Sequence, residues 1–178
     1  MMKRRNFSLN SGSRSASRAR VRFNDDNRLE VYSGAVEVGQ GLLNMIAQVA
    51  AEETGVSLER VRVIAADTGL TPEAGSSSAT RQTYFTGNAV KLACSELREH
   101  LLDIAGMRLG VHPLEIAAAN DRLWDMARPD APVELDTILD DARRRGQKLE
   151  AEALFKPRTL ADFKGKVEEV YINEAKER

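Results

Sequence analysis

The sequence has 178 residues, of which 42% are hydrophobic and 30% charged, and its net charge is −1. This is the composition of an ordinary globular domain, and it argues against a fibrous or wholly disordered protein. No apolar run approaches the about 18 residues of a membrane-spanning helix, so we expect no insertion into a membrane.

The first segment of the chain is basic and rich in serine. Residues 1–23 hold seven of the 26 Lys and Arg and no acidic residue, so 19 basic and 27 acidic residues remain beyond them, a net charge of −8. We predict that residues 1–17 form a disordered, solvated arm. A basic arm on an acidic body can also bind an acidic partner or nucleic acid, and of these we do not expect nucleic acid.

Two features of the sequence bear on the cellular compartment of the protein. The run RRNFSL at residues 4–9 is similar to the start of a twin-arginine export signal, but serine-rich residues follow where such a signal has an apolar segment. The single cysteine, Cys94, excludes an internal disulfide, a four-thiolate zinc site and an iron–sulfur cluster built from this chain. We therefore expect a reducing, cytoplasmic location. An organelle transit peptide shares the composition of the arm, so that alternative stays open.

The chain then alternates between strand and helix patterns. Residues 21–23 and 29–36 are β-branched or aromatic around the turn NDDN, which predicts a β-hairpin. Apolar residues next recur at helical spacing, which predicts a helix over about 41–54 that stops at Gly55. Ser57 is a candidate cap of a short turn, and the alternation that follows it predicts a strand over 61–65.

A loop and a long helix follow. Residues 68–80 hold one proline, two glycines and small hydroxyl residues, which predicts a loop. From Val90 to Ile104 the apolar positions step by three and four residues, so we predict one helix from about Arg81 to Leu109 that ends at Gly110.

The remaining segments are shorter. Residues 113–125 predict a strand pair, 133–146 a capped helix and 147–155 a strand. The fold class is α+β, with a short mixed sheet packed by two main helices. Residues 18–155 form either one domain or two small lobes, 18–110 and 111–155, and residues 156–178 form a polar tail.

Gly39-Gln40-Gly41 lies where the strand pattern changes to a helix pattern. Glycines let a ligand approach the backbone, and the following helix directs unpaired N–H groups and its positive dipole end toward the same place. The uncharged amide of Gln40 suits the edge of a heterocycle or a neutral oxo group. The alternative is a plain turn with Gln40 in solvent, because a glycine pair alone is weak evidence.

The second polar loop is GSSSATRQT, residues 75–83, at the start of the long helix. Backbone amides and hydroxyl groups at a helix N-terminus can hold a phosphate. The loop lacks the Gly-Lys-Ser/Thr ending of a P-loop, so hydrolysis of a nucleoside triphosphate is not supported. Its alternative is a flexible serine-rich connector capped by Thr80.

The other candidate residues give little indication of a metal or catalytic site. His100 and His112 are too far apart in the sequence for a metal site and fit structural or surface positions. Cys94 falls on the apolar stripe of the long helix and fits a small core residue. No carboxylate is marked as a base, so we assign no catalytic residue.

The order and spacing of the two loops resemble the molybdopterin-binding large subunit of the xanthine dehydrogenase and aldehyde oxidase family of molybdenum hydroxylases. Three consecutive segments between about Glu30 and Leu109 carry the similarity: GAVEVGQG, then IAQVAAEETGVSLERVRVIAADTGLTPEAGSSSATRQT, then GNAVKLACSELREHL. A weaker similarity after LGVHPLEI extends to about Phe155. The resemblance implies the fold of one molybdopterin-binding lobe.

The resemblance also implies a cofactor, molybdopterin with molybdenum, in a plain or a dinucleotide form. Carried over by position, Gln40 would hydrogen-bond the cofactor and the backbone around Ala79 would lie near the metal. The residues assigned in this way to cofactor binding are Gly39, Gln40, Gly41, Ser76, Ser77, Ser78, Ala79, Thr80, Arg81 and Gln82. No protein ligand to the metal is assigned.

The chain resembles only a fragment of the family's large subunit, because the later segment that carries a base glutamate has no counterpart here. We predict the molybdenum-cofactor-binding portion of an enzyme that hydroxylates an aldehyde or N-heterocycle, inactive alone. Iron–sulfur and FAD centres are expected only on partner chains, which are other parts or subunits of a molybdenum hydroxylase. The alternative is a non-catalytic remnant or assembly module that binds a protein or nucleic acid through its basic arm. The substrate and the oligomeric state do not follow from the sequence.

Overall fold

The computed structural model describes residues 16–78 and 80–157. The predictions for the basic arm up to residue 15, for Ala79 and for the tail from residue 158 lie outside the described residues. Within the described ranges, no helix is both long and apolar enough to cross a membrane.

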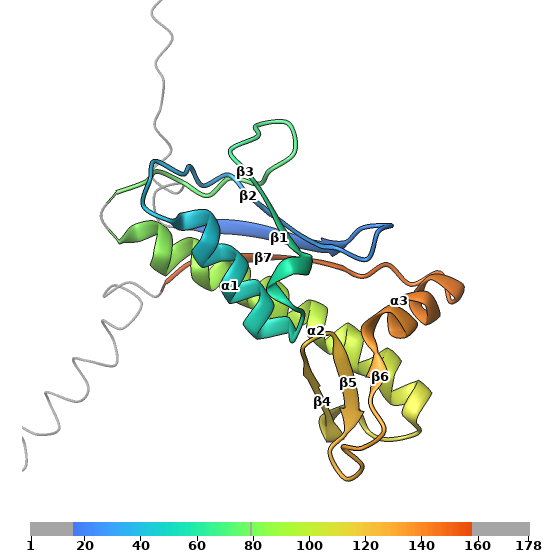
Figure 1. Ribbon diagram of the computed structural model, residues 1–178. Coiled ribbons are helices and arrows are strands. Elements are labelled where there is room, and N and C mark those ends of the chain that lie inside the picture. Colours follow the sequence, from blue (N-terminus) through green and yellow to red (C-terminus); the bar gives the residue numbers. More distant parts are fainter. Residues whose placement is uncertain (1–15, 79, 158–178) are drawn as a thin grey trace, which may run out of the picture.

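A four-stranded mixed sheet forms one layer of the fold (Figure 1). Its strands are β1 (Ser17–Phe23), β2 (Leu29–Ser33), β3 (Val61–Ala65) and β7 (Glu150–Phe155), in the order β3-β2-β1-β7. β1 runs antiparallel to β2 and β7, and β2 runs parallel to β3. The predicted hairpin, the strand over 61–65 and the mixed sheet are therefore confirmed. In the hairpin turn, the Asn24 carboxamide oxygen accepts from the N–H groups of Asp26 and Arg28.

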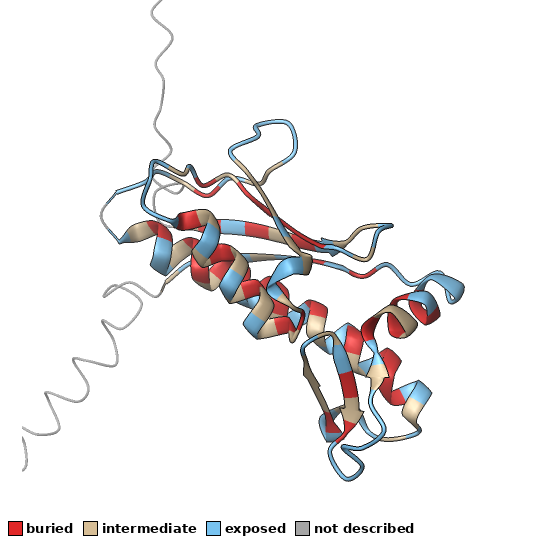
Figure 2. Cartoon of the chain, in the orientation of Figure 1, coloured by how far each residue is buried: buried red, intermediate tan, exposed pale blue. Residues whose placement is uncertain are grey.

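Two helices, α1 (Leu42–Thr54) and α2 (Gly87–Leu109), cover one face of this sheet (Figure 1). Ala19 and Val21 of β1 are fully buried on that side, whereas the alternate residues of β1 are arginines. The buried residues of both helices are coloured red in Figure 2, and Ile46 of α1 and Leu97 of α2 belong to one hydrophobic cluster. Burying an apolar side chain of this size stabilises the fold by roughly 1.5–3 kcal/mol, so this layer carries much of the stability.

Both main helices end at the predicted glycines. Gly55 and Gly110 have φ values of 77° and 71°, the left-handed conformation that glycine adopts without strain. Their N–H groups donate to the carbonyls of Ala51 and Gly106 at 2.9 and 2.8 Å. The start of the long helix differs from the prediction, because Gln82–Thr86 forms a π-helical turn before α2 begins.

A second, smaller unit lies at the end of α2 (Figure 1). It contains β4 (Ile116–Ala119), β5 (Arg122–Asp125), β6 (Val133–Glu134) and α3 (Leu135–Arg144), with the strands in the order β4-β5-β6. Single 3₁₀ turns precede β3, at Leu58–Arg60, and β4, at Pro113–Glu115. The predicted strand pair and helix are confirmed.

The two units share one hydrophobic core. Ile116, Leu123 and Ile138 from the smaller unit belong to the same cluster of buried side chains as α1 and α2. The turn between β4 and β5 also bonds the end of α1, since the Asp121 N–H donates to the Gly55 carbonyl at 3.1 Å. The division of residues 18–155 into one domain or two lobes stays a prediction.

Candidate cofactor site

Residues of both polar loops line one cavity of about 250 Å³. The first loop precedes α1, and the second precedes the π-helical turn at the start of α2. Because α1 and α2 pack side by side, their N-terminal ends bring the two loops together. The residues that line the cavity are Val38, Gln40, Gly41, Leu42, Met45, Ser77, Ser78, Gln82 and Thr83. Five of the ten predicted site residues are therefore among its lining residues.

The first loop is held by Gln40 and by a carboxylate that was not singled out from the sequence. The Gln40 side chain accepts from the Val38 N–H at 2.7 Å and donates to the Val36 carbonyl at 3.1 Å. Glu37 accepts from the N–H groups of Gly39, Gly41 and Leu43 at 2.7–3.1 Å. A carboxylate two residues before the glycines was the available signal, because acidic groups favour helix N-termini.

The glycines of the first loop leave its surface open. Gly39 and Gly41 have φ values of 99° and 78°, which side-chain-bearing residues rarely adopt. A Cβ atom built on either glycine would meet no atom within 4 Å. Both therefore permit the backbone conformation of the loop and leave its backbone accessible.

The buried Gln82 side chain holds the second loop through hydrogen bonds. This side chain is only 5% exposed, and its amide nitrogen donates to the Gly75 carbonyl and to the Ser77 hydroxyl, both at 3.3 Å. Its oxygen accepts from the Thr86 hydroxyl, which in turn bonds Ser17 of β1 at 2.9 Å. Gln82 thus links the cavity wall to the sheet.

Arg81 lies away from the cavity. Its guanidinium donates to the carbonyls of Ala74, Ser76 and Ala16 at 2.8–3.0 Å and lies 4.4 Å from the centre of the Phe85 ring. The guanidinium therefore links the loop to the chain segment that leads into β1. The exposed Thr80 is not among the residues that line the cavity.

A larger cavity of about 590 Å³ is lined by the start of the second loop and by residues around β2 and β3. Ser76 lines this second cavity, together with Val36 and the loop that follows β3. Gly34 is pressed against that loop, because a Cβ atom at this position would lie 2.5 Å from the Pro72 carbonyl oxygen. Of the nine predicted site residues that the structure describes, five line the cavity between the loops, Ser76 lines the second cavity, and Gly39, Thr80 and Arg81 line neither.

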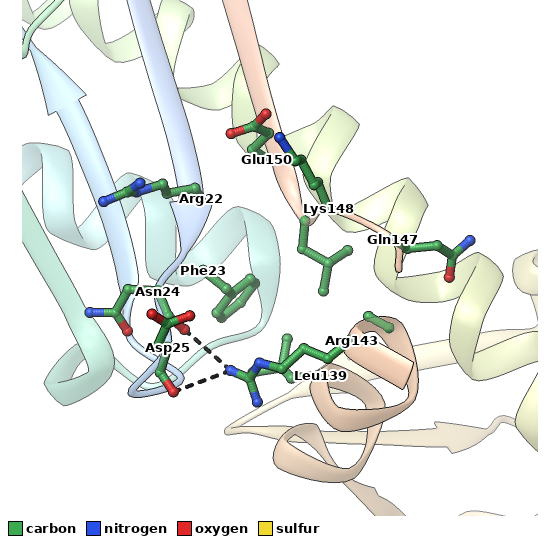
Figure 3. Close-up of a pocket in the computed structure, with 11 residues that line it drawn as sticks. Arg22, Phe23, Asn24, Asp25, Leu139, Arg143, Gln147, Lys148 and Glu150 are labelled. Carbon is green, nitrogen blue, oxygen red and sulfur yellow. Dashed lines mark hydrogen bonds between the residues drawn. The ribbon is translucent and has the colours of Figure 1, made fainter. Parts of the chain in front are cut away.

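A third cavity, of about 310 Å³, is remote from the two loops in the fold. It lies between the β1–β2 turn and the connection from α3 to β7 (Figure 3). Arg143 at its rim donates to the carbonyls of Asn24 and Asp25 at 3.2 and 3.4 Å, so this cation is engaged by the protein itself. None of the ten predicted site residues is among its lining residues.

The carboxylate of Glu37 is hydrogen-bonded to the first loop. The pKa of Glu37 is lowered chiefly by the Leu43 N–H and further by the N–H groups of Gly39 and Gly41, so this group is ionised at neutral pH. Across residues 16–78 and 80–157, no three His, Cys, Asp or Glu side chains gather where they could hold a metal ion.

The sequence matches a known family of domains and several relatives. Residues 2–175 match the family described as molybdopterin cofactor-binding domain. The chain is 33% identical over 146 residues to the xanthine dehydrogenase molybdenum-binding subunit of Escherichia coli, covering 79% of this chain and 19% of that subunit. It is 36% identical over 83 residues to the xanthine dehydrogenase of Blastobotrys adeninivorans, covering 47% of this chain and 6% of that protein.

Solved structures show the same fold. Quinoline 2-oxidoreductase from Pseudomonas putida superimposes with a TM-score of 0.72 at 24% identity, over 80% of this chain and 19% of that one. The reconstituted CO dehydrogenase from Oligotropha carboxidovorans superimposes with a TM-score of 0.71 at 20% identity, over 80% of this chain and 18% of that one. The present chain therefore spans about a fifth of the length of the molybdenum-binding subunit from Escherichia coli and of these solved structures.

Proposed function

The chain belongs to the molybdopterin cofactor-binding domain family, and on this premise we propose that it supplies one wall of the molybdenum-cofactor site of a larger molybdenum hydroxylase. The observation that carries the proposal is the meeting of Gln40, Ser77 and Gln82 around one cavity. Gln40 lies about forty positions before Ser77 and Gln82 in the sequence, and the packing of α1 on α2 brings them together.

The chemistry of the lining fits a heterocyclic cofactor. Among the described residues, those that line this cavity carry amide, hydroxyl, thioether and aliphatic groups and no charge. A primary amide has two N–H donors and an oxygen with two lone pairs, so Gln40 can hold its own loop and still bond a ligand edge. The hydroxyl groups of Ser77 and Ser78 offer further donors and acceptors without a charge that would repel a phosphate.

The size of the cavity and the exposed apolar side chains beside it support completion by another polypeptide. The cavity of about 250 Å³ is smaller than the roughly 300–1,000 Å³ of a complete small-molecule site. Large apolar side chains next to the two loops are exposed: Val36 is 46%, Val38 76% and Tyr84 52% exposed. A partner that covered them would bury apolar surface and close the cavity in one step.

The proposed role is binding and orientation of the cofactor. When bound, the molybdenum centre would supply the oxidative hydroxylation of an aldehyde or N-heterocycle. Gln40 would donate to the heterocycle, Ser77 would bond its polar substituents, and Gln82 would keep Ser77 in place. The electron acceptors, an iron–sulfur centre and FAD, would lie on partner chains. We propose no catalytic residue on this chain, and we expect it to be inactive alone.

The test measures molybdenum per chain by inductively coupled plasma mass spectrometry. The chain is purified alone and after coexpression with the polypeptides encoded beside it. We expect near-stoichiometric metal only in the copurified complex and a clear loss in Gln40→Ala. Gln48→Ala is the matched control, because this exposed glutamine of α1 is not among the lining residues. Its substitution should leave the metal content unchanged. Absence of metal from both preparations would overturn the proposal.

A further inference from the structure

The carboxylate of Glu37 closes the loop that carries Gln40. Its Oε1 accepts from the N–H groups of Gly39 and Gly41 at 2.7 and 3.1 Å, and its Oε2 accepts from the Leu43 N–H at 3.1 Å. One side chain thus bonds backbone groups on both sides of Gln40 and in the first turn of α1.

These contacts place an internal anion at the positive end of α1. The first N–H groups of a helix have no partner within the helix, and their dipoles favour a negative charge. α1 has no acidic residue in its first turn, and its N-cap residue is a glycine that provides no side chain. Glu37 takes over the function that a capping residue serves elsewhere, from five positions before the helix begins.

We propose that Glu37 is the positioning residue of this loop, and that it occupies the place where an external anion would bind, so that the loop receives an uncharged ligand edge and excludes a phosphate. The inference rests on the proposed function and deepens it, because it states which kind of cofactor group this wall accepts. Charged cofactor groups must then be bound elsewhere, at the serine loop or by the partner.

The position of Gln40 depends on the same contacts. Gly39 and Gly41 both have positive φ values. Glycine adopts positive and negative φ about equally readily, so contacts are needed to hold this conformation. A single carboxylate oxygen fixes the N–H groups of both glycines, and the Gln40 side chain is then directed back to Val38 and Val36. Without Glu37, the loop loses the contacts that hold the backbone on each side of Gln40.

The experiment uses the full chain and inorganic phosphate as the probe. Glu37→Gln keeps an oxygen acceptor of the same length and removes the charge. Backbone amide NMR spectra are recorded during a phosphate titration. We expect the amide signals of Gly41 and Leu43 to shift in Glu37→Gln, with phosphate bound about tenfold more tightly than by the wild-type chain. Glu52→Gln, an equal charge change at an exposed site near the other end of α1, should behave as the wild-type chain.

A second readout separates positioning from folding. Glu37→Ala should speed hydrogen exchange at Gly39, Gly41 and Leu43 without changing exchange in the middle of α2, and Glu37→Gln should restore part of the protection. Equal phosphate binding by the wild-type chain and Glu37→Gln would overturn the anion-exclusion part. Unchanged exchange at the three amides in Glu37→Ala would overturn the positioning part.

The metal content distinguishes this inference from the proposed function. If the copurified complex holds molybdenum but Glu37→Gln gains no phosphate binding, the inference fails and the proposed function stands. If the loop responds as expected but no preparation holds molybdenum, the proposed function fails and the assignment of Glu37 as an internal anion stands.

Discussion

The guanidinium of Arg60 binds the carboxylate of Asp136 with two hydrogen bonds, at 2.6 and 3.0 Å. Arg60 ends the 3₁₀ turn before β3, and Asp136 lies in the first turn of α3. A third group, the Asp121 carboxylate in the turn between β4 and β5, lies 3.2 Å from the Arg60 Nε. One cation therefore joins the large sheet to two elements of the smaller unit.

Asp136→Asn should lower stability at neutral pH by about 0.5–1 kcal/mol, because the Asp136 side chain is half-exposed and solvent screens the pair. The hydrogen bonds from Arg60 lower the pKa of Asp136. A lowered pKa contributes stability above the unfolded value of about 3.9, and this is lost as the pH falls through the folded value. The difference in unfolding free energy between the wild type and the variant should therefore shrink below about pH 4. Urea denaturation at several pH values measures it, with the exposed Asp130→Asn as the control.

Gly55→Ala should be far more damaging than Gly110→Ala. Both glycines have left-handed φ values, so each substitution costs about 1–2 kcal/mol in backbone strain. At Gly55 the new Cβ would also lie 2.5 Å from the Ala118 carbonyl oxygen, whereas at Gly110 it meets nothing within 4 Å. We expect a total loss of about 3 kcal/mol or more for Gly55→Ala. Equal losses in chemical denaturation would contradict the close packing of α1 on β4.

Gln82→Ala should weaken both stability and cofactor retention. Its loss leaves the Thr86 hydroxyl and the Gly75 carbonyl without their bonds to this amide, at a cost of about 1–3 kcal/mol. Thr80→Ala changes an exposed residue of the same loop and should leave the unfolding free energy within about 0.5 kcal/mol of the wild type. Thermal unfolding and molybdenum content of the copurified complex measure the two effects. Full stability in Gln82→Ala would rule out its structural role.

Cys94 should resist thiol reagents in the folded protein. Burial raises the pKa of this thiol to about 12, so the reactive thiolate is scarce at neutral pH. Iodoacetamide labelling followed by mass spectrometry should therefore track unfolding, with rapid and complete modification only in denaturant. Stoichiometric labelling of the native chain within minutes would contradict the buried position of Cys94 on α2.

Local chemistry made the helix ends and the hairpin predictable. Gly55 and Gly110 follow the last apolar positions of their helices. The Asn and Asp residues of NDDN favour a tight turn. The π-helical turn over Gln82–Thr86 was not predictable, because it coincides with contacts from Gln82 to Thr86 and from Thr86 to Ser17. Ser17 is 69 residues away from Thr86, and no sequence window contains both.

The candidate site was predictable as two loops, and its internal roles were not. Periodicity placed both loops at helix N-termini, which made their meeting plausible once α1 packs on α2. It gave no information on side-chain direction, so Arg81, whose guanidinium bonds backbone carbonyls of the loop and of Ala16, was grouped with Ser77 and Gln82, which line the cavity. Glu37 was missed because a carboxylate that caps a helix from five positions upstream matches no short capping pattern.

Because β1 pairs with β7, the large sheet can form completely only after β7 has been synthesised. The Arg18 guanidinium donates to the Glu152 carboxylate across this pair at 2.7 Å, yet the two residues are 134 positions apart. A ribosome therefore releases β1, β2 and both long helices well before the strand that covers the free edge of β1. During that interval the nascent chain exposes an unpaired strand edge, which is a surface that chaperones bind and that promotes aggregation when left open. Closure of the sheet is a late, long-range step, and such steps are slow.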